Sequence, residues 1–304
     1  MLKIIFNYLI FPGFVFSATI GLLAGWVDRK LTARLQWRIG PPWHQNFTDI
    51  LKLLGKEAIV PQGAKLTFLF SPYLGLISAV LVSANLGRII ISPLESFGGD
   101  LIVVFYLLAI PAIALIIGAS SSRNPLASIG VSREIKLLLA YELPLILSMI
   151  TIVIKCKGAL QIGQIIQQQA FFGSNVFSFS GALAFIAAIF CMQAKLGVGL
   201  FDVAEADQEI MGGTLIEYSG LPLAVFKLTK AVMLYTVPLF IIILFLGKDL
   251  GPIFLAAKYL MLLAIMILIK NTNPRLRIDQ VLRFFWRIPT ILGAIAVILA
   301  IFGK

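Results

Sequence analysis

An acidic segment late in the chain has the residue types needed for reversible binding of protons or cations. Five of the 14 acidic residues fall within sixteen positions, namely Asp202, Glu205, Asp207, Glu209 and Glu217. If the segment is helical, Asp202, Glu205 and Glu209 share one face at i, i+3 and i+7. Neighbouring carboxylates raise one another's pKa, which permits proton exchange near neutral pH. The alternative is a solvated loop, but the apolar stretches 198–201 and 210–216 on either side of the acids favour partial burial.

A second set of charges lies inside apolar runs. Glu142 follows Tyr141 and precedes Pro144 by two residues, and a later run has Lys227 and Lys230 at i, i+3. A charge within a bilayer costs at least about 3 kcal/mol on insertion scales, so such residues face the interior of a helix bundle or water. Two interpretations stay open: a structural ion pair between Glu142 and a lysine, or a carboxylate–lysine relay for protons. The sequence does not say which lysine faces Glu142.

A basic segment with aromatic residues follows the first apolar run. It contains Arg29, Lys30, Arg34, Arg38, Gly40 and Pro41, with Trp26, Trp37 and Trp43 among them. One interpretation is an anchor at headgroup depth. Pro41 and Pro42 end any helix, and Gly40 permits a tight turn. From Asn46, apolar residues at i, i+3, i+4 and i+7 predict a short amphipathic helix that lies in the membrane plane or under a partner subunit.

The residues that bind metals or clusters are scarce. Cys156, Cys191 and His44 are too few and too far apart for an iron–sulfur or zinc site, so we expect no cofactor in this chain and place any metal in a partner. The pair Gly197 and Gly199 lacks a third glycine and a βαβ context, which excludes a dinucleotide fingerprint.

The elements that must position these residues are membrane helices. Of the 304 residues, 60% are hydrophobic and only 13% are charged, whereas soluble domains carry about 25% charged residues. Runs near 20 apolar residues predict an all-α polytopic protein with eight spans: 8–27, 66–87, 101–119, 134–154, 181–195, 218–246, 251–269 and 287–302. We expect one transmembrane domain over 1–304. Its long loops are a first one at 28–65, with the amphipathic helix, and an acidic one at 196–217.

Basic residues predict the orientation of the chain. Sixteen Lys and Arg residues, Lys65 among them, fall in or beside the first, third, fifth and seventh loops, against six on the other side. The positive-inside rule then places these loops in the cytoplasm and both termini outside the cell membrane. Topology and attraction to the lipid bilayer account for the net charge of +11, and nucleic-acid binding is a poor explanation.

Two ordered motifs make the chain resemble a known family. Arg29-Lys30, Arg34-Leu35-Gln36 and Arg38-x-Gly40-Pro41 look like the first loop of the complex I membrane subunit that contacts the peripheral arm. The second motif runs Phe201-Asp202-x-x-Glu205-Ala206-Asp207-x-Glu209 and continues at Glu217-Tyr218-Ser219-Gly220. The resemblance spans nearly the whole chain. It includes the equivalent subunits of membrane-bound [NiFe] hydrogenases and formate hydrogenlyases.

Within this family the chain looks more like the hydrogenase branch. Pro42 stands where the quinone-reducing branch usually has Asn, and Asp28 stands where many complex I subunits have Glu. Gly40-Pro41-Pro42-Trp43 and the segment 226–231 look like hydrogenase subunits, which puts quinone binding in doubt.

The resemblance implies a subunit that is not catalytic alone. Its partners would be peripheral hydrogenase-like subunits, which hold a [NiFe] centre and iron–sulfur clusters and include a cluster-bearing small subunit, together with antiporter-like membrane subunits. The acidic loop would couple electron transfer to translocation of protons or sodium, Glu142 with Lys227 or Lys230 would carry charge inward, and the basic segment would contact the arm. The alternatives are the quinone-site subunit of a complex I-type dehydrogenase and, from another class, an autonomous ion or solute transporter.

Overall fold

A computed structural model describes residues 2–64 and 66–303, without the side chains of residues 2–5 and 207. Apart from short 3₁₀ turns, the regular structure of these residues is α-helical. In chain order the helices are α1 (Leu2–Leu9), α2 (Phe14–Leu35), α3 (Gln45–Leu54), α4 (Leu66–Ile91), α5 (Asp100–Ser121), α6 (Pro125–Lys155), α7 (Ile162–Phe172), α8 (Phe179–Lys195), α9 (Asp207–Ile210), α10 (Gly220–Phe245), α11 (Pro252–Thr272), α12 (Ile278–Arg287) and α13 (Pro289–Ile301).

The predicted membrane spans are present as helices. Among the described residues, seven helical segments are long and apolar enough to cross a bilayer, and α8 is a shorter apolar helix of 17 residues at the fifth predicted position. The all-α polytopic fold is thereby confirmed. The amphipathic helix expected from Asn46 is α3, and its apolar side packs against α2 and α10 with Ile50 buried.

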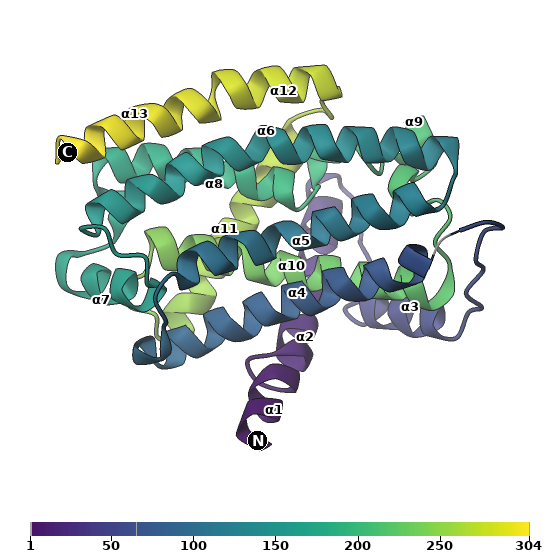
Figure 1. Cartoon of the computed structure of the whole chain (residues 1–304), viewed down its shortest axis with the longest axis horizontal. Helices are drawn as coiled ribbons and strands as arrows, with labels where there is room; N and C mark the ends of the chain where they lie inside the picture. Colours follow the sequence, from purple (N-terminus) through teal and green to yellow (C-terminus); the bar gives the residue numbers. More distant parts are fainter. Residues whose placement is uncertain (1, 65, 304) are drawn as a thin grey trace.

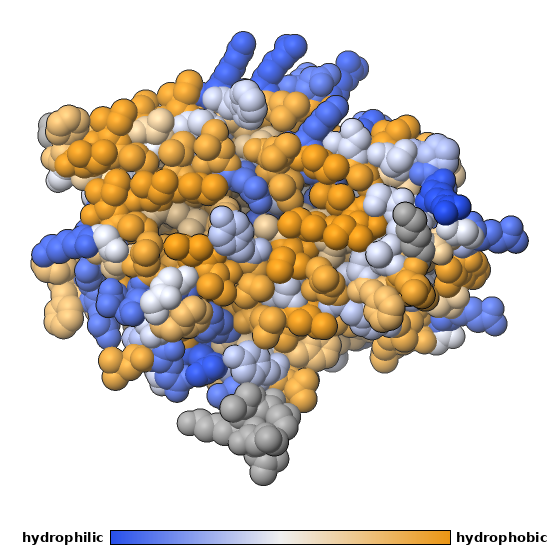
Figure 2. Space-filling view, in the orientation of Figure 1, coloured by the Kyte–Doolittle hydropathy of each residue, from blue (hydrophilic) through white to orange (hydrophobic). Residues whose placement is uncertain are grey.

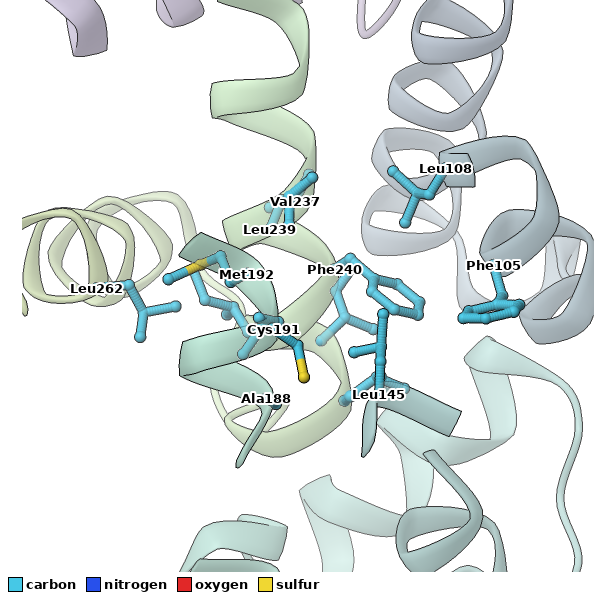
Figure 3. Close-up of a cluster of buried hydrophobic side chains, with 14 of the residues drawn as sticks. Phe105, Leu108, Leu145, Ala188, Cys191, Met192, Val237, Leu239, Phe240 and Leu262 are labelled. Atoms are coloured by element: carbon cyan, nitrogen blue, oxygen red, sulfur yellow. The ribbon is translucent and has the colours of Figure 1, made fainter. Parts of the chain in front are cut away.

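The bundle is built around α10. Helices α4, α5 and α6 lie side by side, and α12 and α13 run along α6 (Figure 1). The apolar window of α10 is 83% buried, against 22–50% in the other six candidate spans. Gly21 lets α2 approach α10 closely, because a Cβ at this position would lie 1.9 Å from the carbonyl oxygen of Ala231. The core between α5, α6, α8 and α10 is aliphatic and aromatic, with Cys191 and Phe240 at its centre (Figure 3).

The surface matches a protein surrounded by lipid. Apolar side chains cover most of the face seen in Figure 2, over the long helices, and polar side chains gather toward its edges. Exposed large apolar residues occur on α4, α5, α6, α11 and α13. A soluble monomer rarely exposes such a contiguous apolar area. These exposed apolar residues therefore form the surface that contacts acyl chains or neighbouring membrane subunits.

Several helices extend beyond the predicted spans. α2 continues to Leu35, so Asp28, Arg29, Lys30 and Arg34 lie on its last turns and not in an irregular loop. α6 starts at Pro125, nine residues before the predicted start. Charged helix-forming residues carry a helix past the membrane surface, because only the apolar length and not the helix itself ends there. α7 was not predicted, and Lys65 lies outside the described residues.

Candidate charge-transfer site

The acidic segment is folded into the end of the bundle. α8 spans about 25 Å at 1.5 Å per residue and is shorter than a hydrocarbon core of about 30 Å. After α8 the chain turns through irregular structure in which Leu200, Phe201, Val203, Ala206 and Ile210 are buried. Irregular backbone is tolerated at this depth only where protein covers it. The apolar residues of the segment are thus buried while the Glu209 side chain stays half-exposed.

Each of three acids in this segment pairs with a cation from a different element. The Arg275 side chain donates a hydrogen bond to Asp202 at 2.9 Å, from the connection between α11 and α12. Lys230 of α10 forms an ion pair with Glu205. Arg133 of α6 donates to Glu209 at 2.6 Å and to the carbonyl oxygen of Val203 at 3.2 Å. The acids therefore connect α6, α10 and the α11–α12 connection.

The predicted helical face of acids does not form. Asp202 follows a 3₁₀ turn, Glu205 lies in a turn, and only residues 207–210 are helical, so the i, i+3, i+7 spacing has no common helix. The positive φ angles of Gly197 and Gly199 interrupt any helix that continues from α8. The side chain of Asp207 lies outside the described side chains.

Glu217 and the adjacent Tyr218 fix the end of the segment. Glu217 accepts a hydrogen bond from Asn124, whose own side-chain oxygen caps the start of α6 by accepting from the Leu126 amide at 2.8 Å. The Tyr218 ring stacks on Phe68 at 4.2 Å, and its hydroxyl donates to the Phe68 carbonyl oxygen at 3.1 Å and lies 3.2 Å from Ser71. Burial raises the pKa of Tyr218 to about 12. These contacts fix residues 217–218 between the acids and α10.

The lysine whose charge acts on Glu142 is Lys195, which the sequence did not indicate. Lys230 pairs with Glu205, whereas the charge that acts on Glu142 comes from Lys195 at the end of α8. The Lys195 ammonium is buried without a hydrogen-bond partner among the described residues and lies 4.9 Å from the centre of the Tyr141 ring. The sequence predicts that Lys195 lies in a loop, because this lysine ends the fifth apolar run. The short length of that run is the one sign that Lys195 lies inside the bundle.

Glu134 completes a row of carboxylate and ammonium groups. It lies two turns before Glu142 on α6 and interacts electrostatically with Glu205, Lys230 and Lys195. Lys195 in turn feels the charges of both Glu134 and Glu142. Electrostatic interactions link Glu205, Lys230, Glu134, Lys195 and Glu142 in that order, and Asp202 also acts on Lys230 and Glu134. Carboxylate and ammonium groups arranged in this way are able to pass protons or small cations between them.

Two cavities meet at this row. A cavity of about 80 Å³ lies between α5, α6, α10 and the acidic segment, and its lining includes Glu134, Lys195 and Glu205. A larger one of about 380 Å³ lies between α2, α3 and α10, and Lys227 and Asp28 are part of its lining. Lys230 lines both cavities, as do residues 196 and 197. Lys230 thus stands at the wall between the two spaces.

The basic segment lies beside the larger cavity. Arg29 donates a hydrogen bond to Asn46 at 2.7 Å and pairs with Asp49 at 3.5 Å, which fixes α3 against α2. Gly40 has a φ of 74°, a left-handed conformation that favours glycine, and the Pro41 carbonyl oxygen accepts from the Trp26 indole at 3.1 Å. Arg34 and Arg38 are exposed, as is Trp37. Lys30 lies on the last turns of α2, half-buried.

The cysteines play no part in a metal site within the described residues. No group of three or more His, Cys, Asp or Glu side chains is placed to hold a metal ion there, and Cys156 and Cys191 are both buried as free thiols.

Fold and site together define a polytopic membrane protein in which a row of carboxylate and ammonium groups connects the acidic segment with the middle of α6. The chain belongs to the NADH dehydrogenase family, whose sequence profile matches residues 8–301. This result confirms the family resemblance found in the two motifs.

Relatives with known names cover most of the chain. A subunit of the NADH-quinone oxidoreductase of Thermomicrobium roseum is 32% identical over 94% of this chain and 92% of its own length. The corresponding NADH-quinone oxidoreductase subunit of a Geobacillus strain is 30% identical over 89% and 84%. Among solved structures, a chain of the archaeal membrane-bound sulfane sulfur reductase, a respiratory membrane complex, superposes with a TM-score of 0.88 at 31% identity, with 98% and 99% of the two chains covered.

Proposed function

We propose that this chain is the membrane subunit that anchors the peripheral arm of an energy-converting, hydrogenase-like oxidoreductase complex. In this role it couples electron transfer in the arm to translocation of protons or sodium. The single observation that carries the proposal is the row of charges from Asp202 to Glu142. It begins at Asp202, which pairs with Arg275, and ends in the middle of α6.

Each part of the row has a role in the proposal. Redox events in the arm change the electrostatic potential at the acidic segment and shift its ion pairs, foremost Glu205 with Lys230. Glu134 and Lys195 then pass the change to Glu142. A buried ammonium without a hydrogen-bond partner is costly to keep, so Lys195 responds strongly to any change in its two carboxylate neighbours.

The proposed partners follow the relatives' names. Curated relatives are subunits of NADH-quinone oxidoreductases, and the structural relative is a chain of a sulfane sulfur reductase complex. We accordingly place this chain beside a cluster-bearing small subunit and antiporter-like membrane subunits, with the [NiFe] centre and iron–sulfur clusters in the arm. An autonomous transporter is disfavoured, because named full-length relatives are subunits of larger complexes.

The quinone-site alternative keeps one supporting observation. The cavity of about 380 Å³ between α2, α3 and α10 has room for a ring-sized ligand beside Asp28 and Lys227. A photoreactive quinone added to the purified complex separates the two functions: labelling of this cavity supports the quinone-site subunit, and labelling absent there supports the hydrogenase-like one.

The central test compares Glu142→Gln and Lys195→Met complexes with a Glu95→Gln control. Glu95 is a carboxylate paired with Arg88 and remote from the row. Assembly, electron transfer in detergent and ion pumping in sealed vesicles are measured side by side. We expect both row variants to assemble and turn over but to lose pumping, while the control pumps normally. Normal pumping by an assembled Glu142→Gln complex would contradict the relay.

The double variant Glu142→Gln/Lys195→Met covers the structural alternative. If Glu142 serves only to neutralise Lys195, removal of both charges restores yield and pumping together, because no unpaired buried charge is left. If the pair belongs to the relay, the double variant assembles as the single variants do and still does not pump.

A further inference from the structure

A cavity of about 460 Å³ lies at the end of α6 remote from the acidic segment. It is formed by the last residues of α6, the end of α7 and the turn before α8. From Arg133, which pairs with the acidic segment, to Lys155 at this cavity, α6 rises about 33 Å at 1.5 Å per residue. Since a hydrocarbon core is about 30 Å thick, the cavity opens at the headgroup level of the opposite membrane surface.

The lining of the cavity is cationic. Lys155 and Lys157 contribute to it, and none of its described lining residues is Asp or Glu. Neither lysine takes part in an ion pair among the described residues. The Lys155 ammonium donates to the Asn175 carbonyl oxygen at 3.2 Å and to the Ser178 hydroxyl, which leaves one of its three donors for a ligand. The site therefore presents positive charge and spare donors to an anion.

Exposed aromatic residues surround the same cavity. Phe171, Phe172 and Phe177 are each more than 80% exposed, and Phe179 is 67% exposed. Phe172 and Phe177 belong to the cavity lining. Aromatic rings exposed to this extent at the membrane surface are stabilised when acyl chains cover them, because this contact removes their apolar area from water. The cavity thus joins a cationic centre to an apolar rim.

The backbone at Lys157 shows that a lysine is retained where a glycine is favoured. α6 ends with the Gly158 amide donating to the Val153 carbonyl oxygen at 2.8 Å and the Lys157 amide donating to that of Ile154 at 3.1 Å. In this termination the residue at the position of Lys157 is left-handed and is usually glycine. Lys157 adopts a φ of 52°, a conformation unfavourable for a residue with a Cβ. Since Trp37, Arg123, Met211 and Asp249 share this conformation, the strain at Lys157 supports a function only together with the cavity that its side chain lines.

We propose that this cavity binds the phosphate headgroup of an anionic phospholipid, with Lys155 and Lys157 as the cationic contacts and the phenylalanine rim against its acyl chains. The inference is independent of the proposed coupling function, because no residue of the charge row lines the cavity.

The test is a lipid-retention measurement on the complex. The complex is exchanged into nanodiscs of phosphatidylglycerol and phosphatidylcholine in equal parts, extracted, and analysed for bound lipid by native mass spectrometry. Each lysine near a headgroup contributes about fivefold to the binding of an anionic lipid. We expect Lys157→Gly, which also relieves the left-handed strain, to lower the preference for phosphatidylglycerol about fivefold. For Lys155→Gln/Lys157→Gly we expect a loss of about 25-fold.

A Lys248→Gln variant is the matched control. Lys248 is an exposed lysine outside the cavity lining, in the connection between α10 and α11. Its removal should leave the lipid preference unchanged. Equal retention of the anionic lipid by the double variant and the wild type would overturn the proposal. Binding of inorganic phosphate without any lipid would overturn it as well. Loss of a partner subunit from the double variant, with lipid retention unchanged, would also overturn it.

Discussion

The ion pair between Glu205 and Lys230 should stabilise the fold by an amount that a double-mutant cycle measures. The perturbations are Glu205→Gln, Lys230→Gln and the two together. Both glutamines keep the approximate length of the side chain and remove one charge each. Because Lys230 belongs to the central helix α10 and Glu205 to the acidic segment, the cycle reports how tightly that segment is attached to the bundle.

The expected magnitude follows from exposure. The Glu205 side chain is 19% exposed and that of Lys230 is 46% exposed. Two unit charges about 4 Å apart at an effective dielectric constant near 20 attract by about 4 kcal/mol. Solvent around the half-exposed lysine and the cost of desolvating the carboxylate offset much of this attraction. We expect a coupling energy of about 1–2 kcal/mol, between that of a surface pair and that of a charged hydrogen bond in the interior.

The assay is reversible unfolding in mixed micelles of mild detergent and SDS, followed by the intrinsic fluorescence of the tryptophans. A coupling energy of about 1–2 kcal/mol confirms that the acidic segment is held in the bundle by this pair. Additive single-variant effects, with a coupling energy near zero, would refute the reasoning, because the two side chains would then not interact in the folded protein.

Three further outcomes can be measured on the same protein. Gly21→Ala should lower the free energy of unfolding by about 2 kcal/mol or more in the same assay, because the added Cβ would overlap the Ala231 carbonyl oxygen. In Gly25→Ala the added Cβ meets only side chains, so this control variant should be destabilised less. Burial raises the pKa of Tyr218 to about 12, against about 10 in the unfolded chain. Its contribution to the free energy of unfolding is therefore present below about pH 10 and is lost between about pH 10 and 12. Tyr218→Phe should remove this part of the loss of stability at alkaline pH. Topology reporters should read outside when fused after Lys304 and cytoplasmic when inserted near Gln62, and equal readings would disprove eight spans.

The spans could be predicted because apolar length is a local property. The Lys195 example shows where that property fails. An apolar run that ends in lysine looks the same whether the lysine reaches the surface or stops inside the bundle, and only the packing of α8 against α6 distinguishes the two. The predicted start of α6 at Glu134 failed for a related reason. Charge marks the membrane boundary, whereas the helix continues through it to the Asn124 cap.

The residues of the site were largely predicted, but their partners were not. The acids in residues 202–217 were identified by their density in a chain poor in acids. Their cations, Arg133, Lys230 and Arg275, lie 76, 25 and 73 residues away along the chain from the acids that they contact. No local pattern specifies such a pairing. Glu134 was used only as a span boundary, and its place between Glu205 and Lys195 depends on three helices at once.

The burial of α10 has a consequence for how the chain enters the membrane during synthesis. At the moment of insertion, α11, the neighbour of α10 that follows it in the chain, is not yet made, and α10 itself contains Lys227 and Lys230. Each lysine near the centre of an isolated helix opposes insertion by about 2.5–3.5 kcal/mol. Glu205 is synthesised before α10, and its pairing with Lys230 neutralises one of the two charges. We therefore expect Glu205 to lower the cost of inserting α10, because this carboxylate is already made when Lys230 enters the membrane.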